Sequence, residues 1–290
     1  MSAIIIAEVG ECFNGSIETA KRMIFEAKKA GCDVVKFQLL DMNETAADDP
    51  EYEWFQKLNL TPEKVNILIQ CAEENGIDIL FTPVSVKTAE YIYNAGQHKV
   101  KIASSLIRKT ELIDYINDHF DSVYISTGMA ELDEIDEVLR CLPKPKEKCI
   151  LHCISEYPTG PLLELYGLKA LDEKDVHLNM MTILKNRYPE LKIGYSDHTD
   201  DIWAPIIAAA MGADIIEKHF TMDRKTPIDH YNNGYSYMGT DHVLSIEPSE
   251  LMCMVKGIKR VELIKGENKW ERSDGEKILK DFLRGRYTER

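Results

Sequence analysis

Short apolar segments rich in valine and isoleucine alternate along the chain with longer segments in which apolar residues recur at helical spacing. This pattern is typical of βα units, because a parallel sheet covered by helices has strands that are apolar on both faces. Eight strands are predicted, at residues 4–9, 33–38, 78–82, 100–104, 123–127, 149–155, 192–196 and 214–219. The helices are predicted at residues 16–29, 62–75, 87–94, 109–120, 132–142, 168–187, 201–210 and 248–264.

Eight strand–helix units within about 250 residues fit a closed (β/α)8 TIM barrel of the α/β class. Gly31, Gly76, Gly96 and Gly212 follow predicted helices, where a residue with positive φ commonly ends a helix. A doubly wound open sheet is disfavoured because neither GxGxxG nor GxxxxGK[ST] occurs. We therefore predict one barrel domain over residues 1–266, with a long polar loop at 222–241. A helical tail follows at 267–290, and its helix, at 275–283, is expected to pack outside the barrel.

The 49 acidic and 35 basic residues leave a formal net charge of −14, which makes nucleic acid and anionic membranes unfavourable partners. The apolar segments are far shorter than the roughly 20 residues that cross a bilayer, and no secretory leader opens the sequence. A cytoplasmic protein is therefore expected. The seven cysteines are an odd number without a CxxC pair, which favours reduced thiols.

Polar residues are predicted at the carboxyl ends of the strands, where TIM barrels carry their active sites. Lysine is unfavourable inside a strand and costly to bury uncompensated, so Lys36 and Lys101 require an explanation. Each lysine could pair with a carboxylate such as Glu8. Two lysines in one mouth instead favour binding of a phosphate or carboxylate ligand. The strand-end set comprises Glu8, Lys36, Gln38, Thr82, Lys101, Ser104, Ser126, Thr127, Ser155, Tyr157, Ser196, Asp197, His198, Glu217 and His219.

Two histidines, His198 and His219, end consecutive predicted strands. Two adjacent imidazoles at the rim suit a divalent metal with open coordination positions, although two hydrogen-bonded core histidines would give the same pattern. Because acidic residues lie beside both, we favour a metal. The first strand contains no HxH motif, which argues against a binuclear hydrolase.

At these strand ends the chain resembles the sialic acid synthase family, whose barrels condense phosphoenolpyruvate with an N-acetylated hexosamine to give a nine-carbon 2-keto-3-deoxy acid. The matching segments run in order from residue 4 to 221, and a further match covers residues 239–251. They are IIAEVGECFNGS, AGCDVVKFQ, FTPVS, VKIASS, ISTGMAELDEI, LHCISEYPT, IGYSDHT, GADIIEKHFT and GTDHVLSIEPSEL.

The resemblance implies roles for individual residues. Glu8, Lys36 and Lys101 would be catalytic, and His198 and His219 would hold Mn²⁺, with Mg²⁺ or Co²⁺ as alternatives. The acceptor sugar would face Glu8, Gln38, Tyr157 and Asp241, with Asp229 as a rival to Asp241. Phosphoenolpyruvate would be bound by Lys36, Thr82, Lys101, Ser104, Ser126, Ser155 and Ser196.

The sequence departs from the family pattern at three places. Phe13 stands where a histidine is usual, and Leu106 replaces a carboxylate of the KIASG[DE] motif. The C-terminal antifreeze-like domain, which in the family lends an arginine to a partner subunit, has no counterpart up to Arg290. We therefore expect either the loop at 222–241 or a separate protein to cover the acceptor site. A homodimer would then rest on the barrel alone.

Two other functions stay open. A barrel of the octulosonate phosphate synthase type would accept a phosphorylated aldose and would need a basic cluster, for which Arg108, Lys109, Arg224 and Lys225 are the candidates. A barrel that binds a ligand or a partner protein without turnover would account for Leu106 and the absent lid. The motifs favour the nonulosonic acid synthase.

Overall fold

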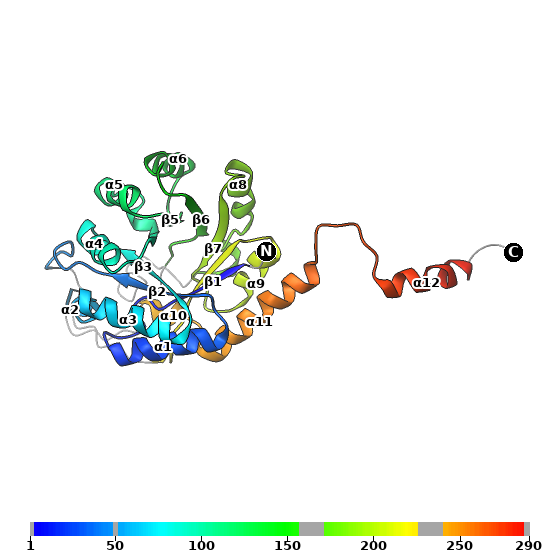
Figure 1. Cartoon of the computed structure of the whole chain (residues 1–290), viewed down its shortest axis with the longest axis horizontal. Helices are drawn as coiled ribbons and strands as arrows, with labels where there is room; N and C mark the ends of the chain where they lie inside the picture. Colours follow the sequence, from blue (N-terminus) through cyan, green and yellow to red (C-terminus); the bar gives the residue numbers. More distant parts are fainter. Residues whose placement is uncertain (1–2, 49–51, 157–170, 226–239, 287–290) are drawn as a thin grey trace.

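The computed structural model describes residues 3–48, 52–156, 171–225 and 240–286 (Figure 1). Its eight parallel strands confirm the predicted barrel, and all eight lie within two or three residues of the predicted positions. Backbone pairing runs in the order β3-β2-β1-β8-β7-β6-β5-β4, and contacts between β3 and β4 bring the two ends of this order together. The strands are β1 Ile4–Glu8, β2 Val34–Leu39, β3 Asp78–Pro83, β4 Lys99–Ile102, β5 Ser122–Ser126, β6 Glu147–Cys153, β7 Lys192–Asp197 and β8 Ile215–His219.

Helices surround the strands and begin and end at residues suited to those positions. The Ser16 side chain caps the first helix and Thr61 caps the helix that starts with Pro62, while Gly31 and Gly76 end these helices in the left-handed conformation. The predicted helices correspond to α1 Ile17–Ala30, α3 Pro62–Asn75, α4 Val86–Asn94, α5 Thr110–His119, α6 Leu132–Cys141, α8 Asn179–Arg187, α9 Trp203–Ala210 and α11 Pro248–Lys265. Shorter elements that were not predicted are α2 Tyr52–Leu58, η1 Ser104–Leu106, η2 Glu173–Asp175 and α10 Thr240–Leu244.

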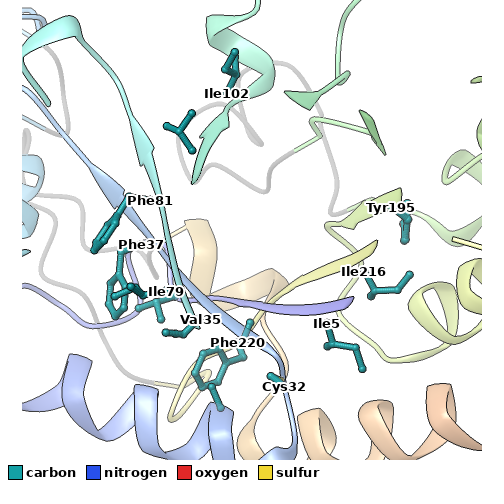
Figure 2. Close-up of a cluster of buried hydrophobic side chains, with 14 of the residues drawn as sticks. Ile5, Cys32, Val35, Phe37, Ile79, Phe81, Ile102, Tyr195, Ile216 and Phe220 are labelled. Carbon is teal, nitrogen blue, oxygen red and sulfur yellow. The ribbon is translucent and has the colours of Figure 1, made fainter. Parts of the chain in front are cut away.

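Two apolar clusters form the core because side chains alternate between the faces of each strand. The larger cluster fills the space between strands and helices, and Figure 2 shows its members Ile5, Val35, Phe37 and Ile216. The smaller cluster lies inside the barrel and comprises Ile6, Leu80, Tyr124, Cys149, Leu151 and Ile215. The polar strand-end residues continue the inward-facing positions of this second cluster, so they stand above an apolar floor.

Two predicted helices need correction. The helix expected at 168–187 is described only from residue 171, where η2 and α8 are separate because His177 adopts a positive φ of 49°. The tail forms α12 Asp274–Gly285 as expected, but none of its residues is buried. The prediction that it packs on the barrel is wrong, since it stands apart from the barrel in Figure 1 with Ile278 and Phe282 exposed.

All seven cysteines are free, in agreement with the reduced thiols expected from the sequence. Among the described helices, none combines the length and the apolar character that a bilayer crossing requires. The expected loop at 222–241 ends in α10, and residues 226–239 lie outside the described part of the chain.

Candidate active site at the carboxyl ends of the strands

Most of the predicted strand-end residues converge on a small pocket at the carboxyl ends of the strands. Each comes from an inward-facing strand position or from the residues directly after a strand, which is why residues far apart in sequence meet here. The pocket is lined by Lys36, Gln38, Thr82, Lys101, Ala103, Ser104, Ser126, Cys153, Ser196, His198, Glu217 and His219.

Two buried lysines share one carboxylate at the base of this pocket. Lys101 Nζ lies 2.8 Å from both oxygens of Glu217, and Lys36 Nζ lies 3.3 Å from Glu217 Oε1. Lys36 Nζ also lies 2.7 Å from Glu8 Oε2 and donates to Thr82 Oγ1 at 3.3 Å. Both expectations for the lysines therefore hold in part, because each lysine pairs with a carboxylate and both line the same pocket.

The four charges of this cluster affect one another's pKa values. Burial raises the pKa of Glu8 despite the adjacent Lys36 ammonium. Burial acts in the same direction on Glu217, but Lys101 and Lys36 outweigh it and hold the pKa of Glu217 far below its usual range. Burial lowers the pKa of Lys101 in spite of Glu217. The pKa of Glu217 is thus lowered and that of Glu8 raised, so Glu8 is the more readily protonated of these two carboxyls.

Hydroxyl groups surround the lysines. Ser196 Oγ donates to Glu217 Oε1 at 2.8 Å, and Ser104 Oγ and Ser155 Oγ are 2.8 Å apart. Gly128 makes room for this serine pair, because a Cβ there would lie 2.0 Å from Ser155 Oγ. Ser126 lines the pocket beside them. Ammonium and hydroxyl donors directed into one small space form a chemical environment suited to an anion.

The two histidines lie side by side at the rim, with ring centroids 5.4 Å apart. Both are buried, with 3% exposure each. His198 Nδ1 donates to the Ile154 carbonyl oxygen at 2.7 Å and lies 3.7 Å from Cys153 Sγ. His219 Nδ1 is buried without a hydrogen bond and lies 3.7 Å from Asp241 Oδ2.

These surroundings give the two rings different charges. Burial lowers the pKa of His198, but the Cys153 side chain, the Ile154 carbonyl and Asp197 outweigh burial and raise it to about 9. Burial, with the nearby His198 and Lys36, holds the pKa of His219 well below its usual range. The site therefore favours one positive charge beside a neutral imidazole.

Asp241 closes the site from the start of α10. Its Oδ2 accepts a hydrogen bond from the Glu11 backbone N–H at 2.8 Å, which ties the loop after β1 to α10. Gly10 permits this approach, since it has a φ of +49° and a Cβ there would lie 2.0 Å from Asp241 Oδ2. Gln38 Nε2 donates to Glu8 Oε1 at 3.3 Å and completes this side of the pocket.

Several sequence predictions require correction or lie outside the described residues. Asp197 does not face the mouth, because alternation along β7 directs it toward the helices, where it pairs with Lys218. Leu106 packs against the hydrophobic core, as does Phe13. Tyr157 and Asp229 lie outside the described residues.

Glu217 was predicted at the mouth without a specific role, and Cys153 was not predicted there. Each lies two residues before a predicted site residue on the same inward face, so the two-residue period of a strand indicates both positions. For Glu217 there was a second signal, because two buried lysines require a carboxylate partner.

A family model described as the NeuB family matches residues 23–270. The chain belongs to the NeuB family. This membership confirms the resemblance to sialic acid synthases and the prediction that the chain is an enzyme of the sugar acid synthase class. Among the described residues, no group of three or more His, Cys, Asp or Glu side chains is placed to hold a metal ion, and His198 and His219 lie there as a pair.

Several relatives of this NeuB chain are named as synthases. An N,N'-diacetyllegionaminic acid synthase of Legionella pneumophila is 30% identical over 310 residues, covering 99% of this chain and 80% of the relative. An N-acetylneuraminate-9-phosphate synthase of Drosophila melanogaster is 29% identical, covering 90% of this chain and 68% of the relative. The N-acetylneuraminic acid synthetase of Leptospira borgpetersenii, solved with citrate, superposes with a TM-score of 0.85 at 29% identity, covering 99% of this chain and 94% of that one.

Proposed function

We propose that this NeuB chain condenses phosphoenolpyruvate with an N-acetylated hexosamine-type aldose, giving a sialic-acid-like nonulosonic acid and phosphate. The observation that carries this proposal is the meeting of two buried lysines, a ring of hydroxyls and two adjacent histidines in one pocket at the strand ends. Such a pocket provides donors for a small multiply charged anion beside a position for an electrophile.

In this proposal Lys36 and Lys101 oppose the phosphate and carboxylate charges of phosphoenolpyruvate. Thr82, Ser126 and Ser196, with the Ser104–Ser155 pair, donate the remaining hydrogen bonds. Glu217 already fixes both ammonium groups at the base of the pocket, so Lys101 needs little reorganisation when the anion enters. Uptake of a proton at Glu8 would release Lys36 for the anion, which agrees with the raised pKa of Glu8.

The two histidines fit a divalent metal such as Mn²⁺. Donation from His198 Nδ1 to Ile154 leaves the lone pair of the neutral ring on Nε2, the usual arrangement of a metal ligand. His219 is held neutral, and its buried Nδ1 lacks a hydrogen bond partner. A cation would replace the proton that the raised His198 pKa indicates. When bound, such an ion would act as a Lewis acid toward the carbonyl oxygen of the acceptor.

The proposed reaction balances without a further co-substrate. C3 of phosphoenolpyruvate attacks the aldehyde carbon of the open-chain sugar, water adds at C2, and phosphate leaves by C–O cleavage. Lys36 and Lys101 would hold the phosphate as it departs and keep the two reacting carbons in contact. Glu8, Gln38 and Asp241 would orient the acceptor, since Gln38 lines the pocket and bonds Glu8, and Asp241 lies 3.7 Å from the lining residue His219.

Phosphorylated aldoses are less favoured as acceptors. Lys109 Nζ pairs with Glu44 and donates to the Val84 carbonyl, and Arg224 pairs with Glu250. Arg108 is highly exposed and lies beside Glu134 of α6. Arg108, Lys109 and Arg224, three of the four candidate basic residues, are therefore engaged at separate places. A homodimer and a separate lid protein remain proposals alongside this one.

The test is release of phosphate from phosphoenolpyruvate with Mn²⁺, measured across a panel of acceptors. The panel comprises N-acetylmannosamine, its 6-phosphate, di-N-acetylated dideoxyhexoses and arabinose 5-phosphate. We expect release that depends on both metal and an N-acetylated acceptor and that His219→Ala abolishes. The matched control is His119→Ala at the end of α5, remote from the pocket, which should retain activity.

Two outcomes would contradict the proposal. Release with arabinose 5-phosphate alone would assign the chain to phosphorylated aldoses. Thermal stabilisation by phosphoenolpyruvate without release of its phosphate in the presence of any acceptor would favour a binding barrel, because ligand binding stabilises the native state whether or not chemistry follows.

A further inference from the structure

A fully buried ion pair lies directly behind the two histidines. Lys218 Nζ donates to Asp197 Oδ2 at 2.6 Å, and both side chains have 0% exposure. Asp197 immediately precedes His198 in the chain, and Lys218 immediately precedes His219. The pair therefore joins the two backbone segments that carry the histidines.

The strand register explains why these two side chains meet. Asp197 and Lys218 are paired positions of the parallel strands β7 and β8, directly after the pair Ser196 and Glu217. Because side chains alternate, Ser196 and Glu217 face the pocket whereas Asp197 and Lys218 face the helix layer. The β7–β8 pairing ends at Asp197 and Lys218. The ion pair is thus the last cross-strand link before the histidines.

Each end of the ion pair is further bound by neighbouring groups. Asp197 accepts from the Tyr195 hydroxyl at 2.5 Å, from the Thr199 backbone N–H at 3.2 Å and from Thr199 Oγ1 at 2.8 Å. Lys218 Nζ also donates to the backbone carbonyls of Thr199 and, at 3.4 Å, Leu244. The Lys218 ammonium therefore connects β7, β8 and α10. His198 directly follows β7, His219 ends β8, and Asp241 lies in α10.

We infer that Asp197 and Lys218 are positioning residues that fix the separation and orientation of His198 and His219. The inference deepens the proposed function and rests on it for the role of the two histidines. Neither residue lines the pocket, so their positioning effect acts through the backbone at the next residue, in addition to the direct effect of the Asp197 charge on His198.

The test compares Asp197→Asn, Lys218→Met and the double variant D197N/K218M. Each single variant leaves one charge buried without its partner, so these variants can be unstable. The double variant removes both charges, keeps an acceptor for Tyr195 and retains most of the lysine side-chain volume. Mn²⁺ affinity is measured by calorimetry without substrates, and the imidazole signals of His198 and His219 are recorded in ¹H–¹⁵N spectra of the metal-free protein.

We expect the double variant to shift both imidazole signals and to bind Mn²⁺ roughly 10–100-fold more weakly, the usual effect of losing support behind metal ligands. Lys192→Met is the matched control, because it removes the ion pair with Glu147 at the opposite end of β7. Val138→Ala, at a buried position of α6, controls for general destabilisation. Both controls should retain wild-type affinity and signals.

Wild-type Mn²⁺ affinity and unchanged imidazole signals in D197N/K218M would overturn the inference, as would an equal loss in Val138→Ala. Failure of the proposed function can be distinguished from failure of this inference. A wild-type protein that binds Mn²⁺ but releases no phosphate contradicts the proposed synthase activity, while the Mn²⁺ affinities of the wild type and the variants still test the role of the ion pair. If the wild-type protein binds no Mn²⁺, the proposed metal site is wrong. The imidazole signals of the metal-free protein then test by themselves whether the ion pair positions His198 and His219.

Discussion

Acid sensitivity of the fold should depend strongly on one buried histidine, His242 of α10. Its Nδ1 lies 2.8 Å from Thr221 Oγ1 and its Nε2 lies 2.9 Å from Asn14 Oδ1, so the ring joins the loop after β1 to the segment after β8. The side chain is 1% exposed. Burial lowers its pKa to about 4 from an ordinary value of 6.5. The perturbation that tests this environment is His242→Gln.

The sign and size of the effect follow from this pKa. Between about pH 4 and 6.5 the unfolded chain binds a proton at His242 and the folded chain does not. Stability from the neutral ring is therefore fully present above pH 6.5 and is lost as the pH falls toward 4. A difference of about 2.5 between the two pKa values, at roughly 1.4 kcal/mol per unit, corresponds to about 3.5 kcal/mol, of which about 3 kcal/mol is lost by pH 4.

The assay is urea unfolding of the wild type and His242→Gln between pH 4 and pH 8. We expect the wild-type advantage in unfolding free energy to shrink by about 3 kcal/mol from pH 8 to pH 4, because only the wild type must protonate this ring. Val138→Ala introduces no titratable group, so its difference from the wild type should not vary with pH. A His242→Gln difference that stays constant, or grows toward low pH, would refute the reasoning.

Three further outcomes are expected. Lys101→Met should destabilise the protein by roughly 3–5 kcal/mol in thermal unfolding, because Glu217 loses a buried partner, and adding Glu217→Gln should restore stability but not activity. Gly10→Ala should reduce phosphate release at least about tenfold in the synthase assay, because its Cβ would displace Asp241 from the rim at a position already strained by positive φ. Removal of residues 267–290 should change the melting temperature by less than about 2 °C, since α12 buries none of its residues.

The barrel was predictable from sequence because each strand is a short apolar run and each helix has its own periodicity. The pocket was predictable for the same reason, since strand ends in a barrel must meet. The side of the sheet that each residue faces was harder to predict. Asp197 and His198 are neighbours in a polar segment, and only the strand register shows that they face opposite directions. The exposed position of α12 was not predictable, because its amphipathic pattern is that of a helix packed on a surface.

The electrostatics of the pocket connect its fold to its proposed chemistry. The ammonium groups of Lys36 and Lys101 and the carboxylates of Glu8 and Glu217 sum to zero formal charge when all four are ionised. This balance allows two lysines to be buried above an apolar floor in a protein whose net charge is −14. It also means that the lysines alone give the pocket no excess positive charge for an anion. Attraction for phosphoenolpyruvate must then come from protonation of Glu8 or from positive charge at the histidines, which is where a divalent cation would lie.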